Sequence, residues 1–409
     1  MLEVRYATSL RMKSDEELRD INRRTFYVMS VKKEWLAVWA VVLLIIIVSC
    51  SKESVNPEFD VPDTPEQLND GWQVSSLLEQ GMNPFIIDTL SQRIRQGDYG
   101  YIHSLLIVRR GTLIFEEYYR NYHVDRLHSI YSVTKSITSA LVGKAVEEGD
   151  IAGIDVRIAD FFPEYEDIIQ ADPQKQNITL RHLLTMTSGF QYDEFTDPYD
   201  SPDNTWNQMH DSDDWVRFVL ELPMVEEPGQ RFNYNSGCTI LLAAILKKAT
   251  GRHADRLADD WLFGPLGITE RQWSYQSSRP NDLPDTGGGL QLRPRDMAKF
   301  GQCYLDGGQW LGVQVVEEDW VTESLTAHVT VEDRVQYGYQ WWSFRYIQIP
   351  EPGVQITRYI PYAAGYSGQH IFLIPACDIL IVITAENGRN GVDFLDIIFN
   401  YIFPAVISN

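Results

Sequence analysis

The chain contains the stretch Tyr131-Ser132-Val133-Thr134-Lys135-Ser136-Ile137, which indicates both its fold and its chemistry. We predict that this stretch opens a helix that continues to Gly143. A serine and a lysine three residues apart lie on the same face of a helix, and the helix N-terminus favours the oxyanion formed when serine attacks a carbonyl. Lysine acts as a base only where burial lowers its pKa, so we expect an apolar setting with few carboxylates. Ser132 and Lys135 are thus a candidate nucleophile and base.

A tyrosine further along the chain could complete this pair. Serine and lysine need a third group to pass the proton to the leaving atom, and a tyrosine hydroxyl can do so in a dry site. The candidate is Tyr234, in the stretch Phe232-Asn233-Tyr234-Asn235-Ser236-Gly237, between a Pro-Gly turn and a predicted helix. The alternative is a packed aromatic residue with a satisfied hydroxyl. The spacing of serine and lysine is not decisive by itself, because Ser30 and Lys33 share it.

A second oxyanion donor should be a backbone N–H on a strand that flanks the serine. The stretch Gly365-Tyr366-Ser367-Gly368-Gln369 leads directly into a strand predicted at residues 370–374. Small residues at this position let the backbone approach a substrate closely. The alternative is a plain hairpin turn.

Composition limits the classes of function. The chain has 409 residues, 44% of them hydrophobic and 22% charged, which suits one large or two intimately joined globular domains. Its net charge is −22, and residues 1–49 carry eight basic and six acidic groups, so the remainder has a net charge of −24. Such a surface repels phosphate backbones, so we expect no nucleic-acid partner.

The N-terminal residues predict export. Trp35–Val48 is an apolar run of fourteen residues, which is short for a membrane span and typical of a secretory signal. We interpret residues 29–49 as a signal peptide and residues 1–28 as an over-extended gene start. An uncleaved N-terminal anchor is the alternative, since such a segment can also stay in place. Both interpretations put the rest of the chain outside the cytoplasm.

A lipid anchor is predicted directly after this signal. Ile47-Val48-Ser49-Cys50 resembles a bacterial lipobox, in which the cysteine becomes the lipidated first residue of the mature protein. Residues 50–70 follow as a tether, and prolines among acidic residues at 51–66 give it that composition. We therefore expect lipid attachment at Cys50, and an exported, membrane-anchored bacterial lipoprotein that faces the periplasm or the cell surface.

Strand patterns at both ends of the remaining chain enclose a mainly helical middle. Strands are predicted at residues 105–108, 113–119, 337–344, 356–359, 370–374 and 379–384. Helices are predicted at residues 180–186, 214–222, 238–250, 254–263 and 392–401. We infer an α/β fold of the α+β type, with a mixed, mainly antiparallel sheet built from both chain ends and flanked by helices. The domain spans residues 71–405 and contains an inserted all-helical domain at about 150–285.

The three candidate stretches, in this order, resemble the serine β-lactamase and penicillin-binding-protein superfamily. They are most similar to its class C-like branch, which includes esterases and 6-aminohexanoate-dimer hydrolases. Three further stretches share this resemblance: residues 178–189, residues 262–268 and residues 287–298. The resemblance implies a β-lactamase/transpeptidase-like fold, with Ser132 as acylated nucleophile, Lys135 as base partner and Tyr234 as second proton-transfer group. It also implies an oxyanion hole formed by the backbone N–H groups of Ser132 and Gln369, and no cofactor.

Two departures from that pattern bear on the substrate. First, the family motif tyrosine-x-asparagine is replaced by Tyr234-Asn235-Ser236. Second, lactamases carry a lysine or histidine directly before a threonine/serine-glycine pair, and this chain has Tyr366 there, followed by Ser367 and Gly368. A cation that would pair with a penicillin carboxylate is thus missing. We therefore expect a small ester, amide or peptide-like substrate, bound by Ser236, Tyr366, Ser367, Gly368 and Gln369. A β-lactamase or DD-peptidase is the enzymatic alternative, and a catalytically silent wall-binding or sensor protein is the alternative of another class.

Other patterns remain open or exclude other chemistry. The sequence has no His-Glu-x-x-His and no cysteine pair at zinc spacing, so we predict no metal site. We interpret Cys238, Cys303 and Cys377 as buried small hydrophobic residues and expect a monomer. The acid-rich, aromatic stretch Asp193–Asp214 is either a solvated loop or a wall of the substrate site. Gly287-Gly288-Gly289 marks a tight turn near that site.

Overall fold

The computed structural model describes residues 64–276, 282–351 and 354–407. The predicted gene start, the signal peptide, Cys50 and residues 50–63 of the tether lie outside these residues. Within the described residues, no helix is both long enough and apolar enough to cross a membrane.

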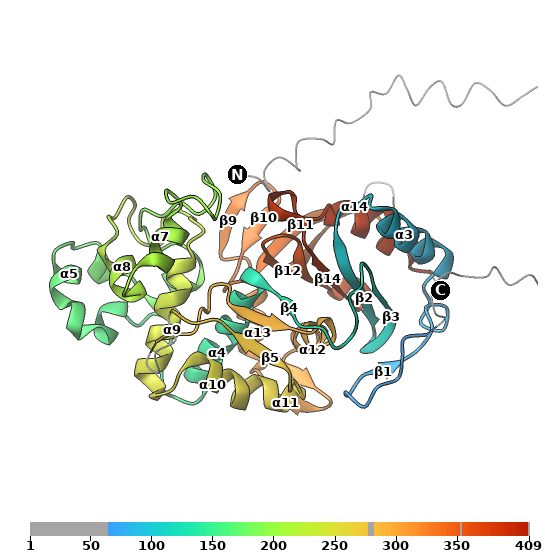
Figure 1. Cartoon of the computed structure of the whole chain (residues 1–409), viewed down its shortest axis with the longest axis horizontal. Coiled ribbons are helices and arrows are strands. Elements are labelled where there is room, and N and C mark those ends of the chain that lie inside the picture. Colours follow the sequence, from blue (N-terminus) through green and yellow to red (C-terminus); the bar gives the residue numbers. More distant parts are fainter. Residues whose placement is uncertain (1–63, 277–281, 352–353, 408–409) are drawn as a thin grey trace, which may run out of the picture. The chain divides into compact units, whose positions relative to one another are not determined.

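A nine-stranded sheet assembles strands from both ends of the domain (Figure 1). Its order is β1-β3-β2-β14-β13-β12-β11-β10-β9, and β1 pairs with β3 in parallel while the other neighbours are antiparallel. The strands are β1 (Gln73–Val74), β2 (Ile102–Arg109), β3 (Thr112–Tyr118), β9 (Val329–Glu332), β10 (Val335–Tyr337), β11 (Trp342–Gln348), β12 (Ile356–Gly365), β13 (Gln369–Ile374) and β14 (Ile379–Ala385). The pairing of β2 with β14 joins the two chain ends, which confirms the predicted sheet.

The central strands are covered on both faces. Every residue of β13 and β14 is buried, and successive side chains of a strand point to opposite faces. On one face, Ile371 and Leu380 lie against Gly301 of α12 (Pro294–Leu305). On the other, Phe372 contacts Phe394 of α14 (Phe394–Ile397). Helices on both faces explain why these strands are continuous apolar runs in the sequence.

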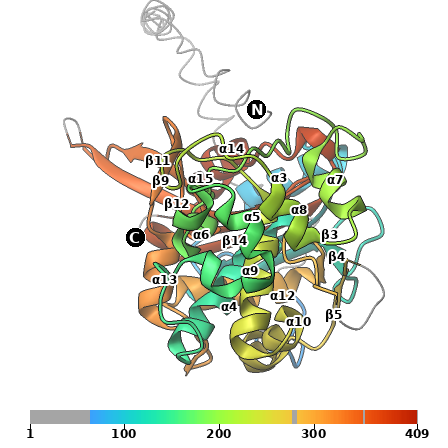
Figure 2. The ribbon, with the colours of Figure 1, turned by 90° about the vertical axis from the view of Figure 1, so that its left-hand side faces the viewer.

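The helical part of the chain is built around two buried helices, α4 (Thr134–Glu147) and α9 (Ser236–Thr250), which pack against each other (Figure 2). Both are buried on nearly all sides, because other elements enclose them. The surrounding helices are α5 (Glu166–Gln170), α6 (Leu180–Leu184), α7 (Thr205–Asp211), α8 (Trp215–Glu221), α10 (Ala254–Ala258) and α11 (Gly264–Leu266), with a π-helical turn η7 at Asp259–Phe263.

The predicted all-helical insertion ends earlier than expected. Residues 271–273 form strand β5 (Arg271–Trp273), which pairs with β6 (Leu290–Leu292), and β6 pairs with β4 (His128–Ser129). The insertion at about 150–285 is therefore helical only in its larger part. A hairpin of β7 (Gln309–Trp310) and β8 (Val313–Gln314), the helix α13 (Glu318–Leu325), the N-terminal helix α3 (Pro84–Gln96) and the C-terminal turns η10 (Ile398–Ile402) and α15 (Phe403–Ala405) complete the described chain.

The prediction of a single strand at residues 337–344 is wrong, because a turn interrupts it. The structure places two strands there, β10 and β11, which pair as a hairpin through Tyr337 and Trp342. Gln340 in the connecting turn has a φ of 62°, and its side-chain amide donates to the carbonyls of Leu183 and Leu184. The aromatic run hides this turn, because Trp341 and Tyr339 are strand-forming residues that are buried in the turn itself.

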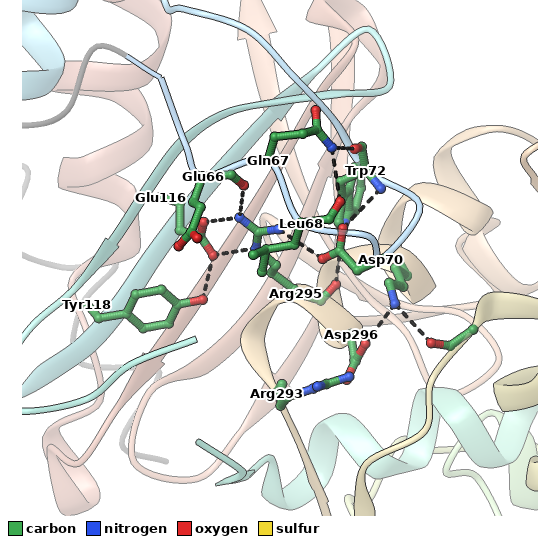
Figure 3. A network of polar contacts seen from close by, with 12 residues as sticks. Glu66, Gln67, Leu68, Asp70, Trp72, Glu116, Tyr118, Arg293, Arg295 and Asp296 are labelled. Carbon is green, nitrogen blue, oxygen red and sulfur yellow. Dashed lines mark hydrogen bonds and ion pairs between the residues drawn. The ribbon is translucent and has the colours of Figure 1, made fainter. Parts of the chain in front are cut away.

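Residues 66–70 are held against the domain, although the sequence places them in the tether. Arg295 at the start of α12 donates to the carboxylates of Glu116 and Asp70 and to the carbonyl of Glu66 (Figure 3). The Arg295 side chain is 3% exposed, and burial of a charge requires such partners. Trp72 also donates its indole N–H to the Arg295 carbonyl. The fixed part of the chain thus begins at or before Glu66, not at residue 71.

Candidate active site

Ser132 lies in a 3₁₀ turn, η3 (Tyr131–Val133), immediately before α4. The sequence predicted this serine at the head of a helix, and in the structure only Val133 separates it from Thr134, the first α-helical residue. Tyr131 has a φ of 45°, a left-handed conformation that is strained for a residue with a side chain. Such strain gathers at functional sites, where the surrounding structure enforces it. Ser132 itself is half-buried, so its hydroxyl is positioned within reach of solvent.

Lys135 approaches Ser132 from the next turn. Its Nζ donates to the Ser132 Oγ at 3.0 Å and to the carbonyl oxygen of Gly287 at 2.5 Å. Lys135 is 1% exposed, and burial lowers its pKa from the ordinary value of 10.5, while the nearby Glu194 and Asp285 oppose this shift. A lysine with a lowered pKa is a stronger candidate for a base, because more of it is neutral near pH 7.

Two carboxylates near Lys135 correct one expectation. The sequence predicted a carboxylate-poor setting, since the helix that carries Lys135 has no acid before Glu147. The structure brings in Glu194 and Asp285 from distant parts of the chain, and both are buried. Sequence spacing gives no signal for either residue, because each reaches the site only through tertiary packing.

Tyr234 lies beside both residues, in the loop that leads into α9. The centroid of its ring lies 4.9 Å from the Lys135 Nζ. Burial raises the pKa of Tyr234 well above its usual range, and the nearby Ser132 side chain opposes that shift. The phenol therefore stays protonated at neutral pH and can donate a proton. The structure thus brings the three predicted catalytic residues together.

The glycine turn at 287–289 lies next to Lys135, as predicted. Asp285 Oδ1 accepts the N–H groups of Gly287 and Gly288 at 2.9 Å and 3.0 Å. Its Oδ2 lies 3.3 Å from Nε2 of His210. These bonds fix the turn, and the carbonyl of Gly287 in that turn accepts from Lys135. Asp285 is therefore a support for the lysine that the sequence reasoning missed.

The predicted oxyanion stretch packs against the turn that carries Ser132. A Cβ on Gly365 would lie 2.3 Å from the carbonyl oxygen of Ile130, so only glycine allows this approach. Gln369 opens β13 directly after the turn and pairs with Gly365. The backbones of residues 130–132 and 365–369 are thus neighbours, which is the arrangement that a shared oxyanion hole requires.

Several predicted substrate-binding side chains are engaged elsewhere. The Ser367 hydroxyl accepts the N–H of Gly388, and the Gln369 side chain is bonded to Tyr366 and Ala385 backbone groups. Gly368 has a φ of 102° and lies against Val392. Among the side chains of residues 366–369, that of Tyr366 is turned toward the site. Its ring contacts Tyr131 at 5.6 Å.

Ser236, a further predicted substrate contact, is also engaged. It is 1% exposed, and both its N–H and its hydroxyl donate to the carboxylate of Glu194, at 2.9 Å and 2.8 Å. A hydroxyl bound in this way is not available to a substrate. Ser236 therefore holds Glu194 rather than a ligand.

The acid-rich stretch lines the site, which favours the second of its two interpretations. Phe195 stacks on Tyr234 with ring centroids 5.2 Å apart, and Tyr199 packs edge-on against Tyr366 at 5.0 Å. Trp342 covers the Tyr234 ring at 5.6 Å, while Trp341 packs in the core with Phe300 and Tyr304. Aromatic side chains therefore pack against Tyr234 and Tyr366.

Other chemistry finds little support. The described residues contain no group of three or more His, Cys, Asp or Glu side chains that could hold a metal ion. Cys238 and Cys303 are buried, as expected, whereas Cys377 is half-buried and differs from the prediction. Burial raises the pKa of the Cys238 thiol to about 12, which makes this cysteine, close to the lysine, a poor nucleophile.

Comparison with known proteins gives consistent matches. Residues 91–398 match the family described as Beta-lactamase. The chain is 27% identical over 302 residues to the 6-aminohexanoate-dimer hydrolase of Paenarthrobacter ureafaciens, which covers 68% of this chain and 70% of that protein. It is 28% identical over 185 residues to Esterase EstB of Burkholderia gladioli, covering 44% of this chain and less than half, 46%, of the esterase.

A solved structure shows the same fold. The structure of EstCE1, a hydrolase with promiscuous acyltransferase activity, superimposes with a TM-score of 0.63 at 16% identity, and the match covers 81% of this chain and 100% of that one. At this identity the likeness concerns the fold alone. It agrees with the mixed sheet and helical insertion described above.

Proposed function

The chain belongs to the beta-lactamase family, and from this premise we propose that it is a serine hydrolase that cleaves an ester or an uncharged amide through an acyl-enzyme on Ser132. The observation that carries the proposal is the 3.0 Å contact between the buried Lys135 Nζ and the Ser132 Oγ, with Tyr234 beside both. The relatives named Esterase EstB and 6-aminohexanoate-dimer hydrolase support this reaction class.

Acylation would proceed by transfer of one proton and exchange of one bond. The Ser132 Oγ attacks the substrate carbonyl carbon while the neutral Lys135 amine takes the hydroxyl proton. The backbone N–H groups of Ser132 and Gln369 then donate to the tetrahedral oxyanion. The bond to the leaving group breaks as that group takes the Tyr234 phenol proton, which Tyr234 regains from the protonated Lys135, so Lys135 is neutral again and the acyl group stays on Ser132.

Deacylation repeats these steps in reverse. Water attacks the acyl-enzyme carbonyl and gives its proton to the same groups, and Ser132 leaves with a proton as the acid is released. No step requires a group that the chain does not supply. The buried, protonated Tyr234 and the lowered pKa of Lys135 suit this exchange near neutral pH.

An ester assay tests the proposal. Wild-type protein should hydrolyse p-nitrophenyl acetate or butyrate, and Ser132→Ala should lose the activity. Ser139→Ala is the matched control, because Ser139 lies on the same helix α4 and its buried hydroxyl has no hydrogen-bond partner among the described residues. Equal rates in the wild type and in Ser132→Ala would refute the proposal.

Two acylation outcomes point to the other functions. Labelling of Ser132 by a fluorescent penicillin would favour a penicillin-interacting DD-peptidase or lactamase. Absence of acylation by esters, amides and β-lactams alike would favour a silent binding or sensor protein. Tyr366, which stands where lactamases carry a cation, leads us to expect weak penicillin labelling.

We also propose that the protein is exported and anchored by a lipid on Cys50. The apolar run at Trp35–Val48 and the lipobox-like residues before Cys50 support this proposal. Cys50→Ala should release the protein from the membrane fraction of expressing bacteria. Unchanged fractionation of this variant would contradict lipid attachment at Cys50.

A further inference from the structure

Glu194 is a buried carboxylate whose partners all lie around the active site. It is 2% exposed. Its Oε2 accepts the N–H of Ser236, and its Oε1 accepts the hydroxyls of Ser236 and Tyr199, at 2.8 Å and 3.0 Å. A buried carboxylate is stable only where hydrogen bonds and favourable charge replace water. Here three donors do so.

The position of Ser236 adds to this stabilisation. Ser236 is the first residue of α9, a helix of fifteen residues, and a helix N-terminus carries partial positive charge and unpaired N–H groups. Glu194 thus caps α9 from a different part of the chain. This contact fastens residues 193–204, which form no helix or strand, to a rigid element of the catalytic site. We refer to residues 193–204 as the aromatic segment.

The residues close to Glu194 in the aromatic segment face the catalytic groups. Phe195, the next residue, stacks on Tyr234 and remains 37% exposed. Tyr199 is bonded to Glu194 and packs against Tyr366. The two rings therefore lie against Tyr234 and Tyr366, and one of them is hydrogen-bonded directly to Glu194.

We propose that Glu194 is a positioning residue that fastens the aromatic segment to α9 and so builds the wall that selects uncharged, apolar acyl groups. This inference rests on the proposed hydrolase function and names the substrate class for it. Glu194 acts through Phe195 and Tyr199 and does not touch the reacting atoms. The rings form an apolar surface, and each additional buried methylene of an acyl chain gains free energy against such a surface.

The Glu194 charge provides an independent readout. Glu194, Asp285 and Cys238 raise the pKa of Lys135 against the effect of burial, and the titratable Tyr234 also faces the amine, with its ring centroid 4.9 Å from Nζ. Loss of the Glu194 charge should therefore lower the pKa of Lys135 and move the acid limb of the kcat/KM profile to lower pH. Entry of water into a loosened site would move that limb to higher pH, since hydration favours the charged amine.

The experiment compares acetate and butyrate esters of p-nitrophenol in the wild type and four variants. Glu194→Gln keeps the shape of the side chain but cannot accept all three hydrogen bonds. We expect the KM ratio of butyrate to acetate to rise about tenfold, as for loss of the apolar contact that buries the two additional methylenes of butyrate, with kcat for acetate changed about threefold or less. Ser236→Ala should change the ratio in the same direction but less, because its N–H still donates to Glu194. The matched control is Asp211→Asn, since Asp211 is an exposed acid outside the aromatic segment.

The double variant Glu194→Gln/Ser236→Ala decides whether the contact is the cause. If the two residues act through one contact, the double variant should resemble Glu194→Gln, and additive effects would overturn the inference. An unchanged KM ratio and acid limb in Glu194→Gln would also overturn it, while wild-type activity would leave the hydrolase proposal standing. Lack of wild-type activity would instead refute the hydrolase proposal and this inference with it. Should Glu194→Gln not fold, an unchanged ratio in Ser236→Ala would refute the inference by itself.

Discussion

Replacement of Lys135 by methionine would connect the reactivity of this lysine with the stability of the fold. The amine is 1% exposed and burial lowers its pKa from the ordinary value of 10.5. Methionine has similar length and no charge, so the variant removes the titrating group while most of the buried volume stays filled. Activity should fall about 10²- to 10⁴-fold, the usual contribution of a general base.

The stability effect has a defined sign. Consider the pH window from the lowered pKa of Lys135 in the folded protein up to 10.5, its pKa in the unfolded chain. In this window the lysine of the unfolded chain binds a proton, whereas that of the folded protein does not. The free energy of unfolding contributed by the wild-type lysine therefore rises with pH across this window, by up to about 1.4 kcal/mol per pH unit. Below the window, the folded protein has to bury a charged amine. The stability of the methionine variant relative to the wild type should thus be highest there and fall as the pH rises toward 10.5.

Two measurements on the purified protein test this linkage. Denaturant unfolding of both proteins from pH 6 to pH 10.5 gives the difference in the free energy of unfolding, in which the titration of other groups largely cancels. The acid limb of the wild-type kcat/KM profile gives the pKa of the free enzyme's base. The stability difference should begin to fall at the pH of that kinetic limb.

A second buried lysine serves as the control. Lys175 is 6% exposed and donates to the carbonyl of Leu220, and burial lowers its pKa as well. Lys175→Met should show a pH-dependent stability difference but leave the kinetic limb in place. If the difference in the free energy of unfolding between Lys135→Met and the wild type does not vary with pH, Lys135 does not have a lowered pKa in the folded protein. A kinetic limb at a pH unrelated to the start of the fall in this difference would refute the same claim.

Two further predictions concern the framework around the site. Arg295→Met should leave the buried Glu116 and the nearby Asp70 without their cation, so the free energy of unfolding should fall by about 3–5 kcal/mol. Limited proteolysis should also cut residues 66–70 faster in this variant than in the wild type. Equal stability and equal cleavage rates would contradict the role of this network. Gly143→Ala places a Cβ about 2.5 Å from the Trp320 ring. The overpacking should cost about 1–3 kcal/mol, more than the gain of about 1 kcal/mol in helix propensity, so the melting temperature should fall. A higher melting temperature would contradict this close packing.

Sequence reasoning was most successful where the information is local. The apolar runs at β13 and β14 predicted buried strands, and the serine–lysine spacing placed both residues one turn apart, where the structure has them. Reasoning failed where neighbours are distant in sequence. The turn between β10 and β11 is fixed by bonds from Gln340 to Leu183 and Leu184, more than 150 residues away, and no local pattern shows these contacts.

The predicted substrate contacts illustrate the same limit. Ser236, Ser367 and Gln369 were chosen by their place in motifs, but the direction of a side chain depends on which donors and acceptors packing brings near it. In the structure the Ser236 hydroxyl donates to the Glu194 carboxylate, and the Ser367 hydroxyl accepts the N–H of Gly388. It also brings Glu194 to a lysine that the sequence alone placed in surroundings poor in carboxylates.

The sequence by itself determined the sheet built from both chain ends, the buried helix that carries Lys135 and the identity of the three catalytic candidates. The strands, the helix and the serine–lysine pair follow from periodicity and spacing, which act over a few residues, whereas the role of Tyr234 is implied by the family resemblance. Only the tertiary structure decided the charge environment of Lys135, the packing of the aromatic segment against Tyr234 and Tyr366, and the attachment of residues 66–70 to Arg295. Those features arise from Coulomb and hydrogen-bond energies, which depend on distance in space rather than on separation along the chain.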